Sequence, residues 1–187
     1  MLRRAKKDQY LEGLKNEFDG LIESLRLDPE QKRFIRERWL DQVIWMEGKA
    51  NQARDRYYRL RFTTVTLAVI IPGLVSLTTI DGDWGDWGTA IKLLTLAVST
   101  TVAVCAAIEE FFHFGERWRT YRRTVERLKT EGWLYFELSG PYHAEGATHR
   151  AAFTSFVQRV EEIIQRDVEV YVTEVSVEKE RQEQGSG

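Results

Sequence analysis

Residues suited to metal binding and covalent chemistry are scarce in this sequence, which has one cysteine and three histidines among 187 residues. The single cysteine, Cys105, excludes an intramolecular disulfide and a cysteine-based zinc cluster, and in its apolar surroundings we expect it to pack as a small hydrophobic residue. None of His113, His143 and His149 belongs to a pair with HExxH spacing, and the chain has neither a glycine-rich phosphate loop nor a nucleophile elbow. We therefore expect no metal site, no cofactor and no enzymatic activity.

An excess of positive charge is also missing. The net charge is −2 at pH 7, so the composition gives no electrostatic reason to expect nucleic-acid binding. The basic N-terminus, MLRRAKKDQY, has no apolar segment directly behind it, and we expect no cleavable signal peptide. The mean hydropathy of −0.41 is typical of a soluble chain, but this average conceals a strong clustering of the apolar residues.

Charged residues are almost absent from two segments. Residues 62–80, FTTVTLAVIIPGLVSLTTI, have no charge, and as a helix they would span roughly 28 Å, close to the thickness of a hydrocarbon core. Residues 91–108, IKLLTLAVSTTVAVCAAI, carry only Lys92, near one end, where its side chain can reach the interface. The alternative, two core helices of a soluble protein, would require a polar stripe, whereas Thr and Ser are scattered round the first segment. Transmembrane helices tolerate its Pro72-Gly73 pair. We predict membrane helices at residues 60–80 and 91–112.

The distribution of basic residues predicts the orientation of these helices. Close to the two apolar segments, arginines occur only on their outer flanks. They are Arg54, Arg56, Arg59 and Arg61 before the first segment, and Arg117, Arg119, Arg122 and Arg123 after the second. Since basic residues near span ends favour the cytoplasm, we expect both termini in the cytoplasm and a short loop at residues 81–90 on the outer side of the membrane. Trp84 and Trp87 would anchor that loop at the headgroups, with Arg61 and Arg117 as anchors at the inner side. We expect the second group, Arg117, Arg119, Arg122 and Arg123, to contact anionic lipid headgroups. Binding of a phosphorylated ligand is the less favoured alternative.

The remaining residues, 1–59 and 113–180, have helical patterns. We expect helices at residues 3–26 and 29–59, the second starting at Asp28-Pro29 and running into the first span. Its apolar seam consists of Ile35, Trp39, Val43, Met46, Ala50, Ala53 and Tyr57. The second span is expected to continue over residues 113–140 and to stop at Gly140-Pro141. The loop GPYHAEG (140–146) would connect to a last helix at 148–180, with partner docking as its alternative role, and a disordered tail would follow at 181–187.

These patterns predict an all-α membrane protein in which a hairpin of two transmembrane helices extends into a cytoplasmic helical bundle. Three blocks of the sequence resemble the bacterial membrane proteins of domain-of-unknown-function family 4231, which belongs to the SLATT superfamily of two-transmembrane-helix proteins. The blocks are RYYRLRFTTVTLAVIIPGLVS (56–76), LKTEGWLYFELSGPY (128–142) and FVQRVEEIIQRDVEVYV (156–172). The resemblance implies pore formation, and for some relatives a membrane-perturbing role beside nucleotide-signalling and defence systems. It implies no catalytic residue.

Small residues of the second span allow two interpretations. Residues Thr95, Ser99, Ala103 and Ala107 follow one another at four-residue steps, a spacing that lets helices approach closely in lipid. In a pore, the same region would line a channel with Thr95, Ser99, Val102 and Ala106. These angular positions overlap, so the sequence leaves both interpretations open.

Acidic residues stand near both ends of the second span. Glu109 and Glu110 would pair with Arg117 or be hydrated at the interface; alternatively, they would form a carboxylate ring that attracts cations at the inner mouth of an oligomeric pore. The loop residues Asp81, Asp83 and Asp86 would form an outer ring, or serve simply as turn formers. Because two spans cannot enclose a pore, we predict a homo-oligomer that conducts cations and is gated through its cytoplasmic helices. Its expected partners are further copies of itself, lipid, ions and a cytoplasmic signalling protein or nucleotide.

Two alternatives to a pore remain. The first is a membrane-anchored helical scaffold, sensor or effector that conducts no ions, which would need only the small-residue seam and the cytoplasmic bundle. The second is a soluble all-helical protein.

Overall fold

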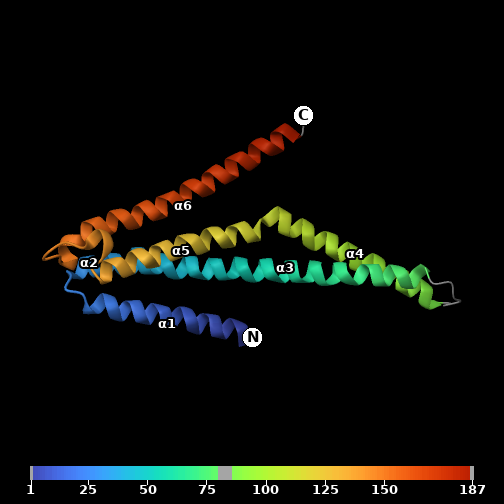
Figure 1. The fold of residues 1–187 in the computed structure, drawn as a ribbon, viewed down its shortest axis with the longest axis horizontal. Helices are drawn as coiled ribbons and strands as arrows, with labels where there is room; N and C mark the ends of the chain where they lie inside the picture. Colours follow the sequence, from blue (N-terminus) through green and yellow to red (C-terminus); the bar gives the residue numbers. More distant parts are fainter. Residues whose placement is uncertain (1, 80–85, 186–187) are drawn as a thin grey trace. The chain divides into compact units, whose positions relative to one another are not determined.

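The computed structural model describes residues 2–79 and 86–185, and describes side chains over residues 6–77 and 87–167. Across these residues the secondary structure is entirely helical, in agreement with the predicted class (Figure 1). The long helices are α1 (Leu2–Ser24), α3 (Asp41–Thr79), α4 (Asp86–Phe112), α5 (Phe114–Phe136) and α6 (His149–Gly185). Three short elements complete the described residues: α2 (Pro29–Phe34), a π-helical stretch at Ile35–Leu40, and a 3-10 turn at Gly140–Tyr142.

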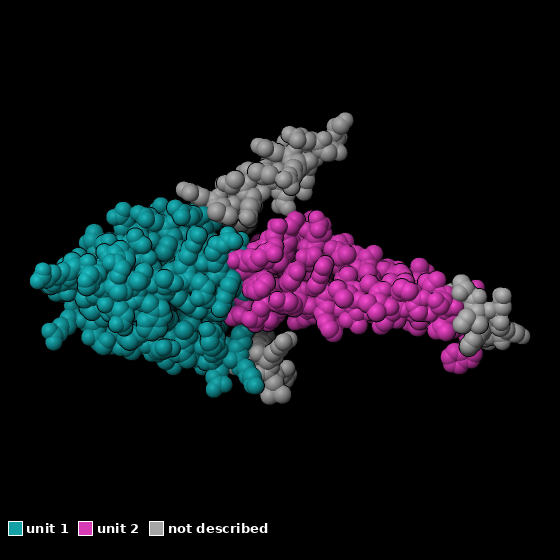
Figure 2. Space-filling model, viewed as in Figure 1, with its two compact units in different colours: residues 1–50, 120–187 teal, residues 51–119 magenta. Residues whose placement is uncertain are grey.

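The chain divides into two compact units (Figure 2). Unit 1 comprises Met1–Ala50 and Thr120–Gly187, and unit 2 comprises Asn51–Arg119. Unit 2 therefore contains both apolar segments. Helices α3 and α5 each contribute residues to both units.

The core of unit 1 is built around the predicted apolar seam. Ile35, Trp39 and Val43 have no exposed surface, and Met46 and Ala50 are 1% exposed. Trp39 makes edge-to-face contacts with Phe18 of α1 and Phe136 of α5, with ring centroids 5.0 and 5.5 Å apart. The residues of this seam in unit 1 are thus confirmed as core. Helix α6 adds Phe156, Val160 and Ile164, which belong to the same cluster.

A glycine lets α5 approach the centre of this core. A Cβ atom added to Gly132 would lie 2.2 Å from Cζ2 of Trp39, which is far inside van der Waals contact. The Trp39 indole NH donates a hydrogen bond of 2.9 Å to the carbonyl of Leu128, one turn earlier on α5. Only a residue without a side chain fits at position 132 beside this buried indole.

Both apolar segments form long helices whose side chains are exposed. Two helices are long and apolar enough to cross a membrane, and none of the residues in either apolar stretch is buried. Many of their large apolar side chains are exposed, among them Phe62 at 74%, Val69 at 75% and Leu93 at 62%. A soluble protein rarely exposes apolar surface on this scale. The fold therefore indicates a membrane protein and disfavours two buried core helices.

The helix ends differ from the sequence expectation at several places. The second apolar helix does not continue without interruption beyond residue 112, because His113 adopts φ +48° and separates α4 from α5. Helix α5 ends at Phe136 rather than at Gly140, because Leu138 takes a left-handed conformation and Ser139 N–H bonds the carbonyl of Leu134 (2.9 Å), a Schellman closure.

The expected tail is also partly helical. Helix α6 runs to Gly185 and so includes residues 181–185, where Glu, Arg and Gln favour helix. Asp81, Asp83 and Trp84 lie outside the described residues, as does the side chain of Asp86, so the predictions for this loop stay predictions.

Candidate functional site

Each apolar helix of unit 2 has one partly covered face. On α4 most half-buried residues recur at steps of three and four, and this line consists of Gly88, Ile91, Thr95, Val98, Val102, Cys105 and Glu109, with half-buried Ser99 beside it. On α3 the matching line is Leu60, Thr63, Leu67, Ile71 and Leu74, with half-buried Thr64 beside it. This spacing is that of a heptad seam. Of the predicted pore residues, Thr95, Ser99 and Glu109 therefore lie on or beside the covered face of α4.

The exposed surface of α4 is divided by residue size. At 100° per residue, one strip about 80° wide carries mostly small or polar residues, interrupted by Leu96. We call this strip the small-residue face; it comprises Thr89, Lys92, Thr100, Ala103, Ala107 and Glu110. The adjoining strip contains several large exposed apolar side chains of the helix, among them Leu93, Leu94, Val104, Ile108 and Phe111. The structure thus separates Ala103 and Ala107, which are exposed, from Thr95 and Ser99.

The two glutamates at the end of the span differ in exposure. Glu109 is half-buried and Glu110 is exposed. Neither forms an ion pair with Arg117 in the part of the chain that the structure describes, so the expected internal pairing is not observed. Glu110 follows Lys92 by 18 residues, which is five helical turns or roughly 27 Å, so both lie on the same line of α4.

Aromatic residues surround the helix break at His113. The rings of Phe112 and Phe114 stack with centroids 5.3 Å apart, and the Arg56 guanidinium lies 5.6 Å from the centroid of the Phe114 ring. The next residue, Gly115, lies against α3, since a Cβ atom there would be 2.9 Å from Cε2 of Tyr57. Aromatic residues beside arginines at a span end are typical of a membrane interface. This cluster was missed from the sequence, although the Tyr57-Tyr58 pair next to Arg56 was a signal for it.

The predicted interfacial anchors are all accessible where they are described. Trp87 is 75% exposed, and Arg61 and Arg117 are exposed. This is the environment that an anchor at the headgroups requires.

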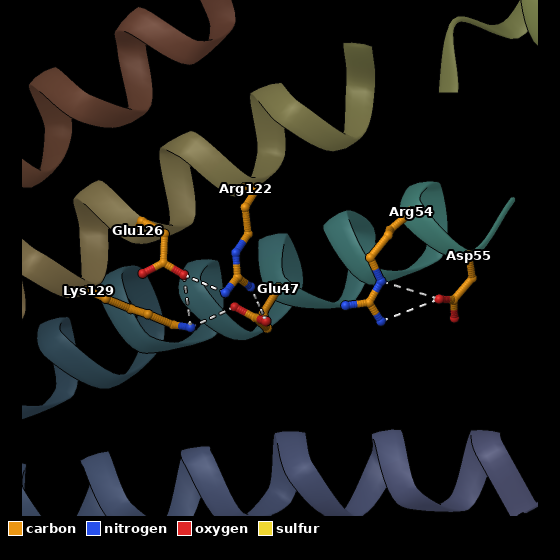
Figure 3. A network of polar contacts seen from close by, with 6 residues as sticks. All are labelled: Glu47, Arg54, Asp55, Arg122, Glu126 and Lys129. Atoms are coloured by element: carbon orange, nitrogen blue, oxygen red, sulfur yellow. Dashed lines mark hydrogen bonds and ion pairs between the residues drawn. The ribbon is translucent and has the colours of Figure 1, made fainter. Parts of the chain in front are cut away.

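A buried carboxylate joins α3 to α5 in unit 1 (Figure 3). The Glu47 side chain is 2% exposed, and its oxygens lie 2.7 Å from the Arg122 guanidinium and 2.6 Å from Lys129 Nζ. Burial raises the pKa of Glu47, but the two cations outweigh burial and hold the pKa below its ordinary value. Arg122, expected to meet lipid headgroups, thus has an internal partner. No local pattern around Glu47 distinguishes it from the other acidic residues of the helix.

A second buried carboxylate joins α5 to α6. Arg159 donates to both oxygens of Glu131, at 2.6 and 3.2 Å, and the Tyr142 hydroxyl donates to the same carboxylate. Burial, reinforced by Glu131, raises the pKa of Tyr142 well above its ordinary value. The hydroxyl therefore stays protonated, and the arrangement is a structural clamp that fixes the 3-10 turn onto the helices.

The functional groups of the described residues do not converge on a reaction centre. No group of three His, Cys, Asp or Glu within the described side chains is arranged to hold a metal ion. The arrangement instead combines two exposed apolar helices, a face of small residues on one of them and a separately packed helical core. It defines an all-helical protein of the membrane-associated class.

The comparison with known families agrees with this class. The family described as "Protein of unknown function (DUF4231)" matches residues 41–150, which is more than half of the chain. The protein belongs to this family, as the resemblance predicted, and the block at 156–172 lies outside the matched residues. No curated protein and no solved structure matches the chain.

Proposed function

We propose that the protein is a homo-oligomeric, cation-preferring pore of a bacterial inner membrane, in which the helix hairpin spans the bilayer and both termini lie in the cytoplasm. The observation that carries the proposal is the small-residue face of α4. In a single chain this face, with Lys92, Thr100 and Glu110, is exposed although it lies on a membrane-length helix. Charged and polar groups on such a helix are expensive in lipid and normally face a helix bundle or water.

Association of several copies would cover this face. Ala103 and Ala107 are exposed and small enough to let another helix approach closely. The adjoining strip of Leu93, Val104 and Phe111 is suited to lipid. We therefore place α4 next to the axis of the oligomer and its large residues on the outside.

The charges on this face support the ion preference. Glu110 is exposed on the same side as Ala103, so copies of it would form a carboxylate ring at the inner mouth. Such a ring concentrates cations. The expected outer ring of Asp81, Asp83 and Asp86 would also concentrate cations. The helix break at His113 is a hinge through which the cytoplasmic helices could open the pore.

Single-channel recording in a planar bilayer under asymmetric salt tests conduction. We expect discrete currents with a cation-selective reversal potential, and a clear shift of that potential toward zero in Glu110→Gln. Glu109→Gln is the matched control, because it removes the same charge from the covered face and should shift the potential less.

The predicted oligomer interface is tested by introducing leucine at two alanine positions of α4, one on the small-residue face and one outside it. Ala107→Leu should weaken the oligomer, measured by light scattering in detergent, because it fills the small-residue face. Ala97→Leu places the same side chain among the large exposed residues and should leave the oligomer intact. Equal effects of the two variants would contradict the assigned axis, whereas an intact inserted oligomer without current would favour the non-conducting scaffold, sensor or effector.

A further inference from the structure

A groove of about 600 Å³ lies between α5 and α6 within unit 1. Four arginines and three glutamates line it, together with Thr130 and the apolar side chains of Leu134 and Ile163. Its volume is within the range of sites that hold small organic molecules. The groove has no part in the proposed pore.

Each of the three glutamates already has a partner. Glu131 is held by Arg159, as described above. Glu126 lies 2.9 Å from Arg122, four residues earlier on α5. Glu162 accepts a hydrogen bond of 3.1 Å from the amide side chain one turn before it. Glu131 and Glu126 are therefore neutralised by arginines, whereas Glu162 is bonded to a neutral amide and keeps its charge.

Three of the four arginines have no such partner. Arg123, Arg127 and Arg166 form no ion pair with any carboxylate whose side chain the structure describes. Arg123 and Arg127 are one turn apart on α5, where like charges repel, and Arg166 lines the groove from α6. The acid next to it, Asp167, accepts a 2.6 Å hydrogen bond from Thr124 and so joins the two helices beside the arginines.

We propose that this groove binds an organic phosphate, with Arg123, Arg127 and Arg166 as the phosphate-binding residues. A phosphate monoester or anhydride carries several oxygens and about two negative charges, which suits guanidinium groups that donate in pairs from both helices. Leu134 and Ile163 would contact the less polar part of the ligand. The anion would also relieve the repulsion between the arginines and hold α6 against α5.

This chemistry is shared by soluble phosphate esters and by phospholipid headgroups, and titration can distinguish the two. The full-length protein in phosphatidylcholine nanodiscs would be titrated calorimetrically with adenosine diphosphate and pyrophosphate, and in detergent with dihexanoyl phosphatidic acid. We expect at least one probe to bind, with a Kd at least about tenfold weaker when all three arginines are changed to Gln. Changing them to Lys keeps the charge but removes the paired donors, and should give an intermediate Kd.

The matched control removes the same charge elsewhere. Lys15→Gln, Arg33→Gln and Lys49→Gln together neutralise three exposed cations outside the groove and should leave the Kd unchanged. Binding of phosphatidic acid alone would assign the site to lipid headgroups, and binding of the soluble probes alone would assign it to free phosphate esters. Equal weakening in the groove and control variants would show nonspecific charge attraction and overturn the proposal, as would the failure of every probe to bind.

Discussion

At the scale of single residues, the contact between Gly132 and Trp39 decides how closely α5 packs in unit 1. The indole has no exposed surface, and its NH is bonded to α5. A side chain at 132 would have to displace the largest ring of the core, and a densely packed interior offers no space for it.

We expect Gly132→Ala to destabilise the protein by about 2–3 kcal/mol, the range for overpacking a rigid core. Gly20→Ala is the control, because nothing lies within 4 Å of a Cβ atom at that helical position. It should stabilise by about 0.5–1 kcal/mol, since alanine favours helix over glycine. Chemical unfolding followed by circular dichroism in detergent measures both, and a harmless Gly132→Ala would contradict the close contact.

Glu47 illustrates a second effect at the residue scale, the stabilisation of a buried charge by two cations. Its pKa in the folded protein lies below the ordinary value of 4.5. The ion pairs therefore stabilise the fold above about pH 4.5, and this contribution is lost as the pH falls through the lowered pKa.

Glu47→Gln should lower the free energy of unfolding at pH 7 by about 3 kcal/mol, the low end for a broken buried pair, because Arg122 is only half-buried. The variant should also lose less stability than the wild type between about pH 5 and pH 3, since the titrating group is gone. Glu23→Gln removes a carboxylate whose side chain is 62% exposed and should have a much smaller effect. Parallel pH profiles of wild type and Glu47→Gln would contradict the assignment.

At the scale of elements, the break at His113 separates α4 from α5. Positive φ is unfavourable for residues other than glycine, although histidine adopts it more readily than alanine. The left-handed residue interrupts the α-helical geometry, and α5 begins at the next residue, Phe114. The expected uninterrupted helix is therefore prevented by one backbone conformation that the apolar pattern does not reveal.

The distance between a residue of α4 and a residue of α5 should depend on the residue at position 113. Spin labels at Val104→Cys and Arg119→Cys, in a Cys105→Ser background, would lie roughly 22 Å apart along a straight helix and closer when it is broken. His113→Ala should shift the distance distribution toward the longer value, whereas His113→Gly should retain the shorter one. Identical distributions in all three proteins would show that packing around Tyr57 and Phe114, and not residue 113, sets the break.

At the scale of the whole molecule, the two apolar helices and the basic flanks make a topological prediction. Trp87 and Glu145 are exposed, and the chain enters and leaves the predicted membrane region on the side of the arginines. If both termini are cytoplasmic, these two positions lie on opposite sides of the bilayer.

Cysteine labelling tests this topology. In a Cys105→Ser background, Trp87→Cys should react with a membrane-impermeant maleimide in intact spheroplasts, and Glu145→Cys should react only after permeabilisation. Cys105→Ser alone, without a target thiol, measures background labelling. The reverse pattern would show the opposite topology, and labelling of both positions in intact spheroplasts would contradict the hairpin.

Much of this protein was predictable because the relevant signals are local. The helical class, the two apolar helices and the seam of Ile35, Trp39 and Val43 follow from hydrophobic spacing along short stretches, and the family follows from the resemblance of quoted sequence blocks. The pattern around Gly140-Pro141 misplaced a helix end, since Leu138 took the left-handed position that glycine usually occupies.

The sequence by itself determined where the chain is apolar and that it is helical, because these properties depend on neighbouring residues, and its resemblance to known sequences determined the family. Only the tertiary structure decided which charges meet: Glu47 with Lys129, 82 positions later, and Glu131 with Arg159. It also left Arg123, Arg127 and Arg166 without carboxylate partners among the described side chains. A charge attracts any opposite charge, so its partner is chosen by the packing that brings distant helices together.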